Sequence, residues 1–388
     1  MKDKMIKRRI KLLGSLLIAI LISIALLQPF CMPSFEDENR IRRFHNEPEN
    51  SLDLVIIGSS DVYTGFSSGL AYRDYGIRSY PYSISGETCL MWETMVRDIL
   101  KTQDPDVILI ETYGAGYGDS HLRETAPEVF KLLDTFPLSL SKFREAKRMA
   151  ELTDDSDTLS FLFPFIKYHG SYGAYFRNLR NFLYLQQNKT TPLKGIHNTT
   201  ATFDAEKLLD LSKVDKTTKL SKASDKAVRE FMEYCKTIDT KVVFIKFPTL
   251  AKEKGSFMYD KHRRSNMVRK IAEEEGFDFI TMQKYAHEIG LDNGNDFYDY
   301  GHANVYGQKK ITAKICEILR DDYGVPSGRS ESSEENEAAW KKSADVYNVY
   351  YELSDKQIKE GVTEDLKDDK DTLRRVLKLL KDKEEKDQ

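Results

Sequence analysis

Short apolar runs alternate with helical patterns along most of this chain, and this alternation limits the fold that it can adopt. Buried parallel strands are short apolar runs, whereas the helices that connect them repeat apolar residues every three to four positions. The apolar runs cover Leu52 to Ile57, Ser79 to Ile84, Val107 to Ile110, Val242 to Phe247 and Phe277 to Ile280. The helical patterns cover Thr88 to Lys101, Asp225 to Thr237, Phe257 to Glu275 and Asn304 to Arg320. The sequence therefore predicts an α/β fold of three layers, with about five parallel strands covered by helices on both faces.

Reactive side chains stand where this sheet should have its carboxyl edge. Gly58-Ser59-Ser60 ends the first apolar run, and Asp299-Tyr300-Gly301-His302 precedes the last helical pattern. A serine hydroxyl is a good nucleophile at neutral pH when an imidazole takes its proton and a carboxylate orients that imidazole. Ser60, His302 and Asp299 supply such a set. Because ligands bind beyond the carboxyl ends of parallel strands, we expect the three residues to meet there.

These motifs resemble those of the SGNH (GDSL-type) hydrolase superfamily over roughly residues 51–323. Gly58-Ser59-Ser60 is similar to the first block of that family, in which the last serine is the nucleophile. Residues 83–88, Ser-Ile-Ser-Gly-Glu-Thr, are similar to the second block, whose glycine amide, here Gly86, joins the amide of Ser60 in the oxyanion hole. The resemblance implies a flavodoxin-like SGNH three-layer fold and serine esterase or acyltransferase activity without a cofactor.

The third block departs from the family pattern, while the last block matches it. The family carries Gly-x-Asn-Asp after the third strand, where this chain has Ile110-Glu111-Thr112-Tyr113-Gly114. The last block, Asp-x-x-His, is matched by Asp299 and His302, and it continues to Asn304 and Gly307. This combination resembles the membrane-anchored branch of the superfamily, including the DltD-like proteins of cell-envelope acylation. That resemblance implies a multipass membrane acyltransferase as partner and a glycan or teichoic-acid-like polymer as acceptor.

Five further residues are expected near the pocket. The first four are Ser59, Asp61, Glu111 and Asn304, which adjoin the motifs above. The fifth is His169, at the end of the aromatic-rich stretch Phe163-Pro164-Phe165-Ile166-Lys167-Tyr168, which is a candidate to fold over the pocket. The alternative for His169 is a histidine packed within an aromatic cluster.

Other reactive groups give weaker patterns. Asp119-Ser120-His121 also offers an acid and an imidazole near the end of the third strand, but it follows Ser60 in the chain and has no glycine signature. The seven histidines lack paired ligand spacing, so no metal site is predicted. The four cysteines are far apart and are expected to be free.

The N-terminus predicts the compartment. Basic residues crowd positions 1–11, and the apolar stretch 12–30 follows them. No Ala-x-Ala cleavage site comes after it, so we expect a retained signal anchor, with a cleaved secretory signal as the alternative. The positive-inside rule then places residues 1–11 in the cytoplasm and the domain outside the cell membrane. Residues 31–50 are predicted to be a linker.

The remaining chain is divided by composition. Residues 51–325 form the predicted SGNH-like domain, in which residues 114–221 are too long for a connector and form an insertion or lid. Residues 326–388 hold a polar, acidic linker and two helical stretches, Ala339 to Leu353 and Thr363 to Lys383. The apolar face of the second stretch could dock on the domain, bind another protein or lie on a membrane. A net charge of −3 over 388 residues gives no reason to expect nucleic-acid binding.

Three functions therefore stay open from the sequence. The first is an extracytoplasmic SGNH-type O-acyltransferase or esterase that modifies an envelope glycan or polyol-phosphate polymer through an acyl-enzyme. The second is a secreted or anchored carbohydrate esterase, that is, a deacetylase. The third is an inactive SGNH-like scaffold that positions a multipass membrane acyltransferase.

Overall fold

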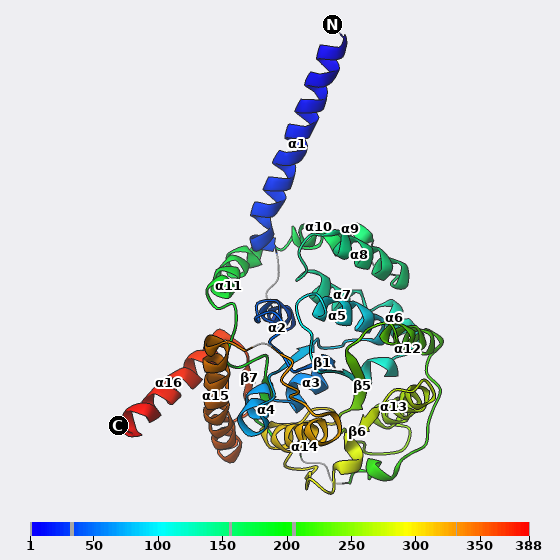
Figure 1. Cartoon of the computed structure of the whole chain (residues 1–388), viewed down its shortest axis with the longest axis vertical. Coiled ribbons are helices and arrows are strands. Elements are labelled where there is room, and N and C mark those ends of the chain that lie inside the picture. The colour runs from blue at the N-terminus through cyan, green and yellow to red at the C-terminus, as the bar shows by residue number, and fades with distance from the viewer. Residues whose placement is uncertain (1, 32–34, 155–156, 204–206, 331, 388) are drawn as a thin grey trace.

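A five-stranded parallel sheet forms the centre of the protein (Figure 1). The computed structural model describes residues 2–31, 35–154, 157–203, 207–330 and 332–387. Its strands lie in the order β2-β1-β3-β5-β6. Their bounds are β1 Leu54–Gly58, β2 Ser79–Ser83, β3 Val107–Glu111, β5 Lys241–Lys246 and β6 Phe279–Thr281. The α/β class and the five parallel strands are thus confirmed.

Helices cover both faces of the sheet. One face packs against α5, α7 and α12 through a core that includes Ile57, Trp92 and Phe244. The other face packs against α3, α4 and α14 through a core that includes Ile56, Phe66 and Ile315. The bounds of these helices and of α13 are α3 Ser60–Gly65, α4 Ser68–Tyr75, α5 Trp92–Ile99, α7 Ala126–Leu133, α12 Lys222–Cys235, α13 Phe257–Glu274 and α14 Val305–Tyr323.

The strand register places the expected site residues at one edge. Gly58 at the end of β1 pairs with Ser83 at the end of β2, and Glu111 at the end of β3 pairs with Ile245 near the end of β5. The backbone continues this alignment beyond the strands, because the Ile84 amide donates to the Gly58 carbonyl at 3.0 Å. The segments that follow β1, β2 and β3 therefore leave the sheet side by side.

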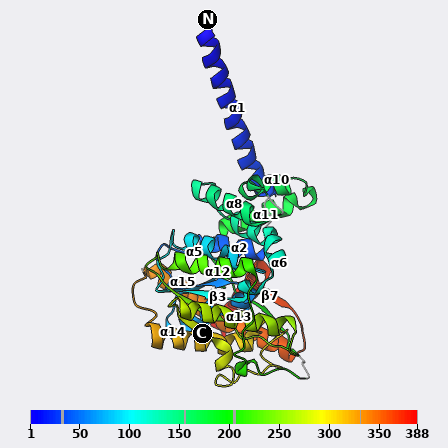
Figure 2. The same ribbon diagram turned by 90° about the vertical axis from the view of Figure 1, so that its right-hand side faces the viewer.

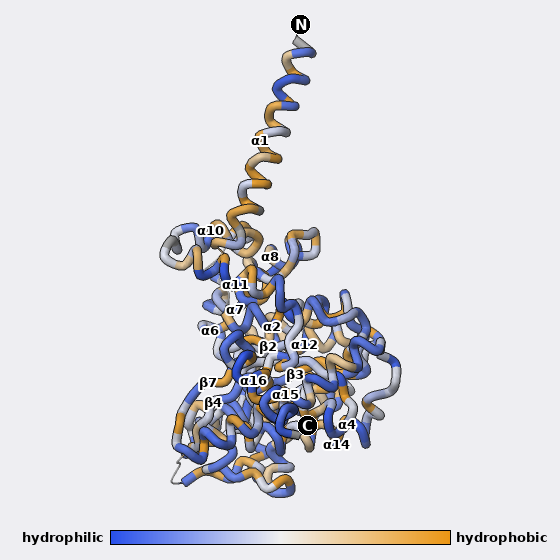
Figure 3. The backbone as a smooth tube through the Cα atoms, turned by 90° about the vertical axis from the view of Figure 1, so that its left-hand side faces the viewer, coloured by the Kyte–Doolittle hydropathy of each residue, from blue (hydrophilic) through white to orange (hydrophobic). Residues whose placement is uncertain are grey.

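A long helix, α1 (Lys2–Cys31), extends away from the domain at the N-terminus. Within the described residues, one helix, Lys4–Cys31, is long and apolar enough to span a membrane. Figure 3 shows that hydrophobic residues fill the part of α1 nearer the domain, with hydrophilic residues toward its free end. The apolar N-terminal helix expected from the sequence is present.

The predicted insertion forms a helical layer at the base of α1. This layer is made of α8 Leu140–Leu152, α9 Thr158–Leu162, α10 Pro164–Tyr168 and α11 Tyr175–Gln187, whereas the short α6 Asp119–Arg123 contacts α12 and α7 packs against the sheet. Helices α10 and α11 contact α1, and the Asn178 side chain donates to the Phe30 carbonyl at 3.0 Å. Figure 2 shows α8, α10 and α11 between α1 and the sheet.

The prediction of a linker over residues 31–50 is wrong. Residues 36–44 form α2 (Glu36–Phe44), with Ile41 and Phe44 fully buried in the core. The charged residues that suggested a linker are buried as ion pairs, because the Arg40 guanidinium lies 2.6 Å from Glu36 and 3.0 Å from Asp37. Residues 1, 32–34, 155–156, 204–206, 331 and 388, which belong to the predicted tail, linker, insertion and C-terminal segment, lie outside the described residues.

The C-terminal segment packs on the domain. Helix α15 (Glu334–Lys359) contacts α4, and α16 (Lys370–Asp387) contacts α15. Leu373 and Val376 of α16 are buried, so the apolar face predicted for this helix docks within the chain. The prediction that this helix begins at Thr363 is wrong, because α16 begins at Lys370. Residues Asp365–Lys367 instead form strand β7, which pairs antiparallel with β4 (His197–Thr199) of the insertion.

Candidate active site

Ser60 is the first residue of α3 and lies one residue beyond the end of β1. The turn needs glycine at position 58, because a Cβ atom there would lie 2.5 Å from Cβ of Glu111 on the neighbouring strand. The backbone of β1 can therefore approach β3 closely and turn at once into the helix. The amide of Ser60 stands at the start of that helix, where backbone amides have no partner within the helix.

Ser60, His302 and Asp299 form one hydrogen-bonded chain. Nε2 of His302 lies 2.7 Å from Oγ of Ser60, and Nδ1 of His302 lies 2.8 Å from Oδ2 of Asp299. The Asp299 carboxylate also accepts hydrogen bonds from the amides of Gly301 and His302, at 2.7 and 2.8 Å. The His302 ring stacks on the Tyr298 ring, with centroids 5.4 Å apart. These contacts fix the imidazole with Nδ1 protonated and Nε2 facing the serine hydroxyl.

The charges around His302 favour its protonated form. Burial lowers the pKa of His302, but the hydrogen bond to Asp299 and the negative charges of Asp61 and Asp299 outweigh burial, so its pKa lies above 6.5. Burial raises the pKa of Asp299, but the contacts with His302 and two backbone amides leave it below 3.8. An imidazolium formed at His302 during proton transfer would thus be stabilised.

The site is open to solvent, and the two amides predicted to bind an oxyanion have no acceptor among the described residues. The side chains of His302 and Asp299 are 26% and 44% exposed. Gly86 has a φ of +75°, a conformation that glycine adopts readily. Among the described residues none accepts a hydrogen bond from the amides of Gly86 and Ser60, so both donors are available.

The third-block position, where an asparagine was missing, holds Thr112 and Tyr113. Thr112 points toward α13, where its hydroxyl lies 2.6 Å from that of Ser265. The ring of Tyr113 lies beneath the Lys261 amine, which is 3.6 Å from the ring centroid and donates to the Tyr113 carbonyl at 3.2 Å. Burial raises the pKa of the Tyr113 hydroxyl, and the carboxylates of Asp61, Glu111 and Asp299 raise it further. The Tyr113 hydroxyl, next to the third-block position in the chain, is therefore a protonated hydrogen-bond donor at neutral pH.

A cluster of buried carboxyls and amines lies near Ser60 and His302. Burial raises the pKa of Asp61, and burial together with the Asp61 charge raises that of Glu111 to about 8. Burial likewise raises the pKa of Glu87 well above its usual value. The amines facing them are Lys246 and Lys261, and burial lowers the pKa of Lys261 to about 7. Three carboxyls therefore face two amines, which keeps protons on some of the carboxyls near neutral pH.

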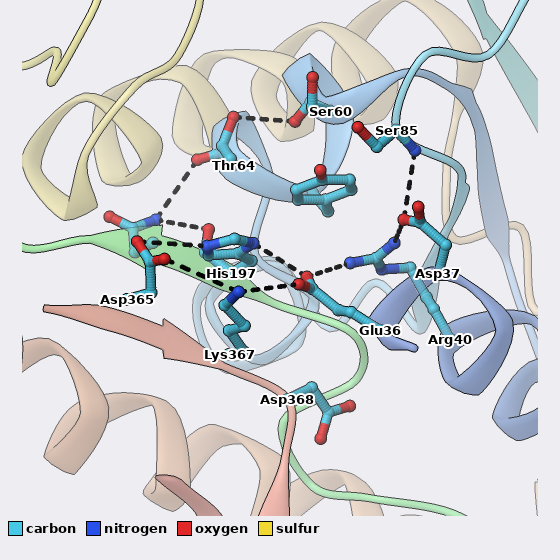
Figure 4. A network of polar contacts seen from close by, with 12 residues as sticks. Glu36, Asp37, Arg40, Ser60, Thr64, Ser85, His197, Asp365, Lys367 and Asp368 are labelled. Carbon is cyan, nitrogen blue, oxygen red and sulfur yellow. Dashed lines mark hydrogen bonds and ion pairs between the residues drawn. The ribbon is translucent and has the colours of Figure 1, made fainter. Parts of the chain in front are cut away.

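Helix α2 contacts the segments that carry Ser60 and Gly86 (Figure 4). The Asp37 carboxylate accepts a hydrogen bond from the Ser85 amide at 3.2 Å, and Arg40 donates to the Ser83 carbonyl at 3.0 Å. Arg40 also covers one face of Tyr63, which follows the nucleophile on α3. The loop that carries Gly86 is therefore held by a helix that the sequence did not predict.

The other candidate residues have varied environments. Ser59 donates to Glu111 at 3.2 Å, and Asn304 caps α14 by accepting from the Tyr306 amide at 3.0 Å. His169 is exposed after α10 and contacts the Ile166 carbonyl at 2.9 Å. Its described contacts are within the helical layer of the insertion, so the structure does not bring His169 to the serine.

The competing motif is not assembled as an acid and base pair. The Asp119 carboxylate accepts from the Ala223 amide at 2.9 Å, and the His121 ring stacks on Tyr117 with centroids 4.0 Å apart. Within the described residues, no group of three or more metal-ligating side chains is arranged to hold a metal ion. All four cysteines are buried and free.

Sequence reasoning missed Lys246, Lys261 and Arg40. Lys246 had a visible signal, because it is a charged residue within the apolar run of β5. Nothing in the sequence indicated a role for Lys261, because α13 carries many basic residues and only the packing shows which of them is buried. Comparison of the sequence with protein-family models gave no match, and comparison with curated proteins gave none either.

Proposed function

We propose that this protein is a membrane-anchored SGNH-type serine O-acyltransferase or esterase that works through an acyl-enzyme on Ser60. The hydrogen-bonded chain from Ser60 through His302 to Asp299 is the observation that carries this proposal. Its position at the carboxyl edge of a parallel sheet adds support, because ligands of such sheets bind there.

The reaction would occur in two balanced steps. First, Nε2 of His302 takes the proton of Ser60 while Oγ forms a bond to the acyl carbonyl, and the donor leaves with that proton. Second, an acceptor hydroxyl gives its proton to Nε2 and takes the acyl group, which frees the Ser60 oxygen to recover a proton. The amides of Ser60 and Gly86 would stabilise the oxyanion in both steps, with Tyr113 as a further donor.

Transfer to an envelope polymer is the favoured form of this activity. The apolar helix α1 would hold the site close to a membrane, and a partly exposed His302 and Asp299 suit an acceptor too large for an enclosed pocket. A multipass membrane acyltransferase would supply acyl groups, and a glycan or polyol-phosphate polymer would accept them. If water replaces the acceptor, the same steps give a carbohydrate esterase.

A fluorophosphonate probe tests the nucleophile. The full-length protein in detergent should be labelled on Ser60, whereas Ser60→Ala should not be labelled. Ser59→Ala is the matched control, because Ser59 is the adjacent serine but its hydroxyl donates to Glu111. Equal labelling of the wild type and Ser60→Ala would exclude Ser60 as nucleophile.

Turnover separates the remaining functions. Steady hydrolysis of p-nitrophenyl acetate by the full-length protein would favour an esterase. A stable acyl-enzyme, seen as a mass increase at Ser60 that disappears only when a polyol acceptor is added, would favour a transferase. Absence of both probe labelling and acylation would favour the inactive scaffold.

The location of the domain needs its own test. We propose that the domain is extracytoplasmic, because the basic residues of 1–11 precede the apolar span and Glu36, Asp37 and Glu38 follow it. Protease added to wall-stripped cells should then degrade the domain and leave α1 in the membrane fraction. A protected domain would contradict this orientation, and a soluble form beginning near Cys31 would show that α1 is cleaved.

A further inference from the structure

A cavity of about 800 Å³ lies between α1, α2 and the helical layer of the insertion, away from Ser60. Such a volume is in the usual range for a bound small molecule. Leu21 and Ile24 of α1 form one wall, and Leu138, Leu162 and Phe182 contribute further apolar surface. The cavity is thus built partly from the helix that is able to span a membrane.

The floor of the cavity carries more positive charge than the carboxyls around it can neutralise. The Arg42 guanidinium makes no hydrogen bond or ion pair with any residue that the structure describes, and its Nη2 atom is shielded from solvent. Lys142 is 3% exposed and donates only to the Phe136 carbonyl, at 3.2 Å. Lys189 also lines the cavity. A buried cation without a partner is costly, so its presence indicates a missing anion.

The carboxyls near these cations are too few to neutralise them, because Arg42, Lys142 and Lys167 share only Asp134 and Glu38 among the described residues. Asp134, which lines the cavity, is paired with Lys167 at 2.7 Å. Glu38 lies close to Arg42, but burial raises its pKa to about 7, so it is partly protonated at neutral pH. Arg43 is already paired with Asp368 at 2.6 Å. The vicinity of Arg42 and Lys142 is therefore electropositive.

The depth of the apolar wall fits a lipid. A helix rises about 1.5 Å per residue, so Leu21 lies about 15 Å along α1 from Cys31, roughly half the thickness of a hydrocarbon core. Ile24 lies between these two levels. One molecule that combines an anion at the floor with apolar chains along this wall would satisfy both parts of the cavity.

We propose that this cavity binds a phospholipid with an anionic headgroup, taken from the membrane leaflet next to the domain. Its phosphate contacts Arg42 and Lys142, and its acyl chains lie along Leu21, Ile24 and Phe182. Large exposed apolar side chains in the same layer, Leu138, Leu140 and Phe176 at 64%, 78% and 84%, place this layer at the membrane surface. The site is independent of the chemistry proposed for Ser60.

Lipid retention by the full-length protein tests the site. Phosphatidylglycerol added to the detergent-purified protein should remain bound in native mass spectrometry at one molecule per chain and should raise the melting temperature. Phosphatidylcholine with the same acyl chains should bind at least tenfold more weakly. Inorganic phosphate alone should have no effect, and equal stabilisation by phosphate would show an anion site and overturn the lipid assignment.

Two double variants, one in the cavity and one on the exposed side of α8, distinguish binding in the cavity from attraction to surface charge in general. Arg42→Gln with Lys142→Gln should lose the retained phosphatidylglycerol at least tenfold. Arg144→Gln with Lys147→Gln is the matched control, because it removes the same charges from exposed positions of α8. Equal loss in the two double variants, or no loss in the first, would overturn the proposal.

A measurement on the wild type covers the case in which the cavity variant fails to fold. Photoactivatable phosphatidylglycerol in vesicles should crosslink to peptides that contain residues 134–142 and 182–189. Crosslinks spread evenly over the exposed helices, or absent from these two peptides, would contradict the site.

Discussion

Oδ1 of Asp61 lies 3.9 Å from Nε2 of His302, the same ring nitrogen that faces the Ser60 hydroxyl. Asp61 is 3% exposed, and its other carboxylate oxygen has no hydrogen-bond partner in the described part of the chain. The imidazole is thus placed between Asp299 at Nδ1 and a second, buried carboxyl at Nε2. Such an arrangement favours the imidazolium.

Asp61→Asn should move the acid limb of the pH profile of the probe-labelling rate to lower pH. A base with a raised pKa is active only above that pKa, so removing a charge that raises the pKa of His302 extends activity to lower pH. We expect the acid limb of the labelling rate to move to lower pH, because the pKa of His302 should fall when the Asp61 charge is removed. Asp119→Asn, distant from the base, should leave the limb in place. An unmoved or rising limb in Asp61→Asn would show that Asp61 is uncharged in the resting protein.

Asp299→Asn should slow serine labelling by about 10³- to 10⁴-fold. The asparagine oxygen can still accept from the amides of Gly301 and His302, so the loop should keep its conformation. The imidazole, however, would lose the partner that stabilises its cation. Labelling rates, with the melting temperature as the folding control, check this expectation, and a loss below tenfold would remove Asp299 from the proposed set.

Tyr113→Phe tests the replacement for the missing asparagine. If its hydroxyl donates to the oxyanion, acylation should slow by about 10²-fold, as for other single donors. The phenyl ring would still lie under the Lys261 amine, so the packing of α13 should be retained. Tyr117→Phe is the control, since its ring also contacts Lys261, at 3.2 Å. Equal rates in Tyr113→Phe and wild type would leave Ser60 and Gly86 as the donors.

Glu36→Gln should destabilise the fold in a pH-dependent way. Burial raises the pKa of Glu36, but His197, Arg40 and Lys367 lower it to about 2. A carboxyl with a lowered pKa stabilises the fold above its unfolded pKa, near 4.5, and this contribution is lost as the pH falls toward 2. The unfolding free energy should drop by up to about 3 kcal/mol at pH 7.

Denaturant unfolding at several pH values measures this loss. The difference between wild type and Glu36→Gln should shrink as the pH falls from 4.5 toward 2. Glu230→Gln, which breaks an exposed pair with Lys226, should cost about 0.5 kcal/mol or less at any pH. If the difference in unfolding free energy between wild type and Glu36→Gln stays constant with pH, the loss comes from changed packing and not from the charge of Glu36.

The local sequence pattern was sufficient to predict the strands of the parallel sheet and part of the candidate site. Each strand of the parallel sheet overlaps one of the short runs predicted as strands. Asp299 lies three residues from His302, so their contact needed no knowledge of the fold. The contact of Ser60 with His302 spans 242 positions, yet the carboxyl edge of a parallel sheet made it predictable. Both inferences used rules that act within one element or along one sheet edge.

Long-range charge pairing was beyond the sequence. Residues 36–44 are so polar that they resemble a linker, and only their distant partners, such as Gly195, whose carbonyl accepts from Arg40 at 3.1 Å, explain why they are buried as a helix. The same holds for strand β7, which forms because β4 offers an edge 166 positions earlier, as the contact of Thr199 with Asp365 shows.

If α1 spans a bilayer, the short connection between α1 and α2 limits how far Ser60 can lie from that bilayer. Residues 32–35 separate the two helices, and five fully extended peptide steps reach about 18 Å at most. Because α2 is packed into the domain and holds the loop beside Gly86, the site cannot swing outward on a tether. A protein anchored in this way would act at a nearly constant height, so a long polymer would be acylated only where it passes close to the membrane surface.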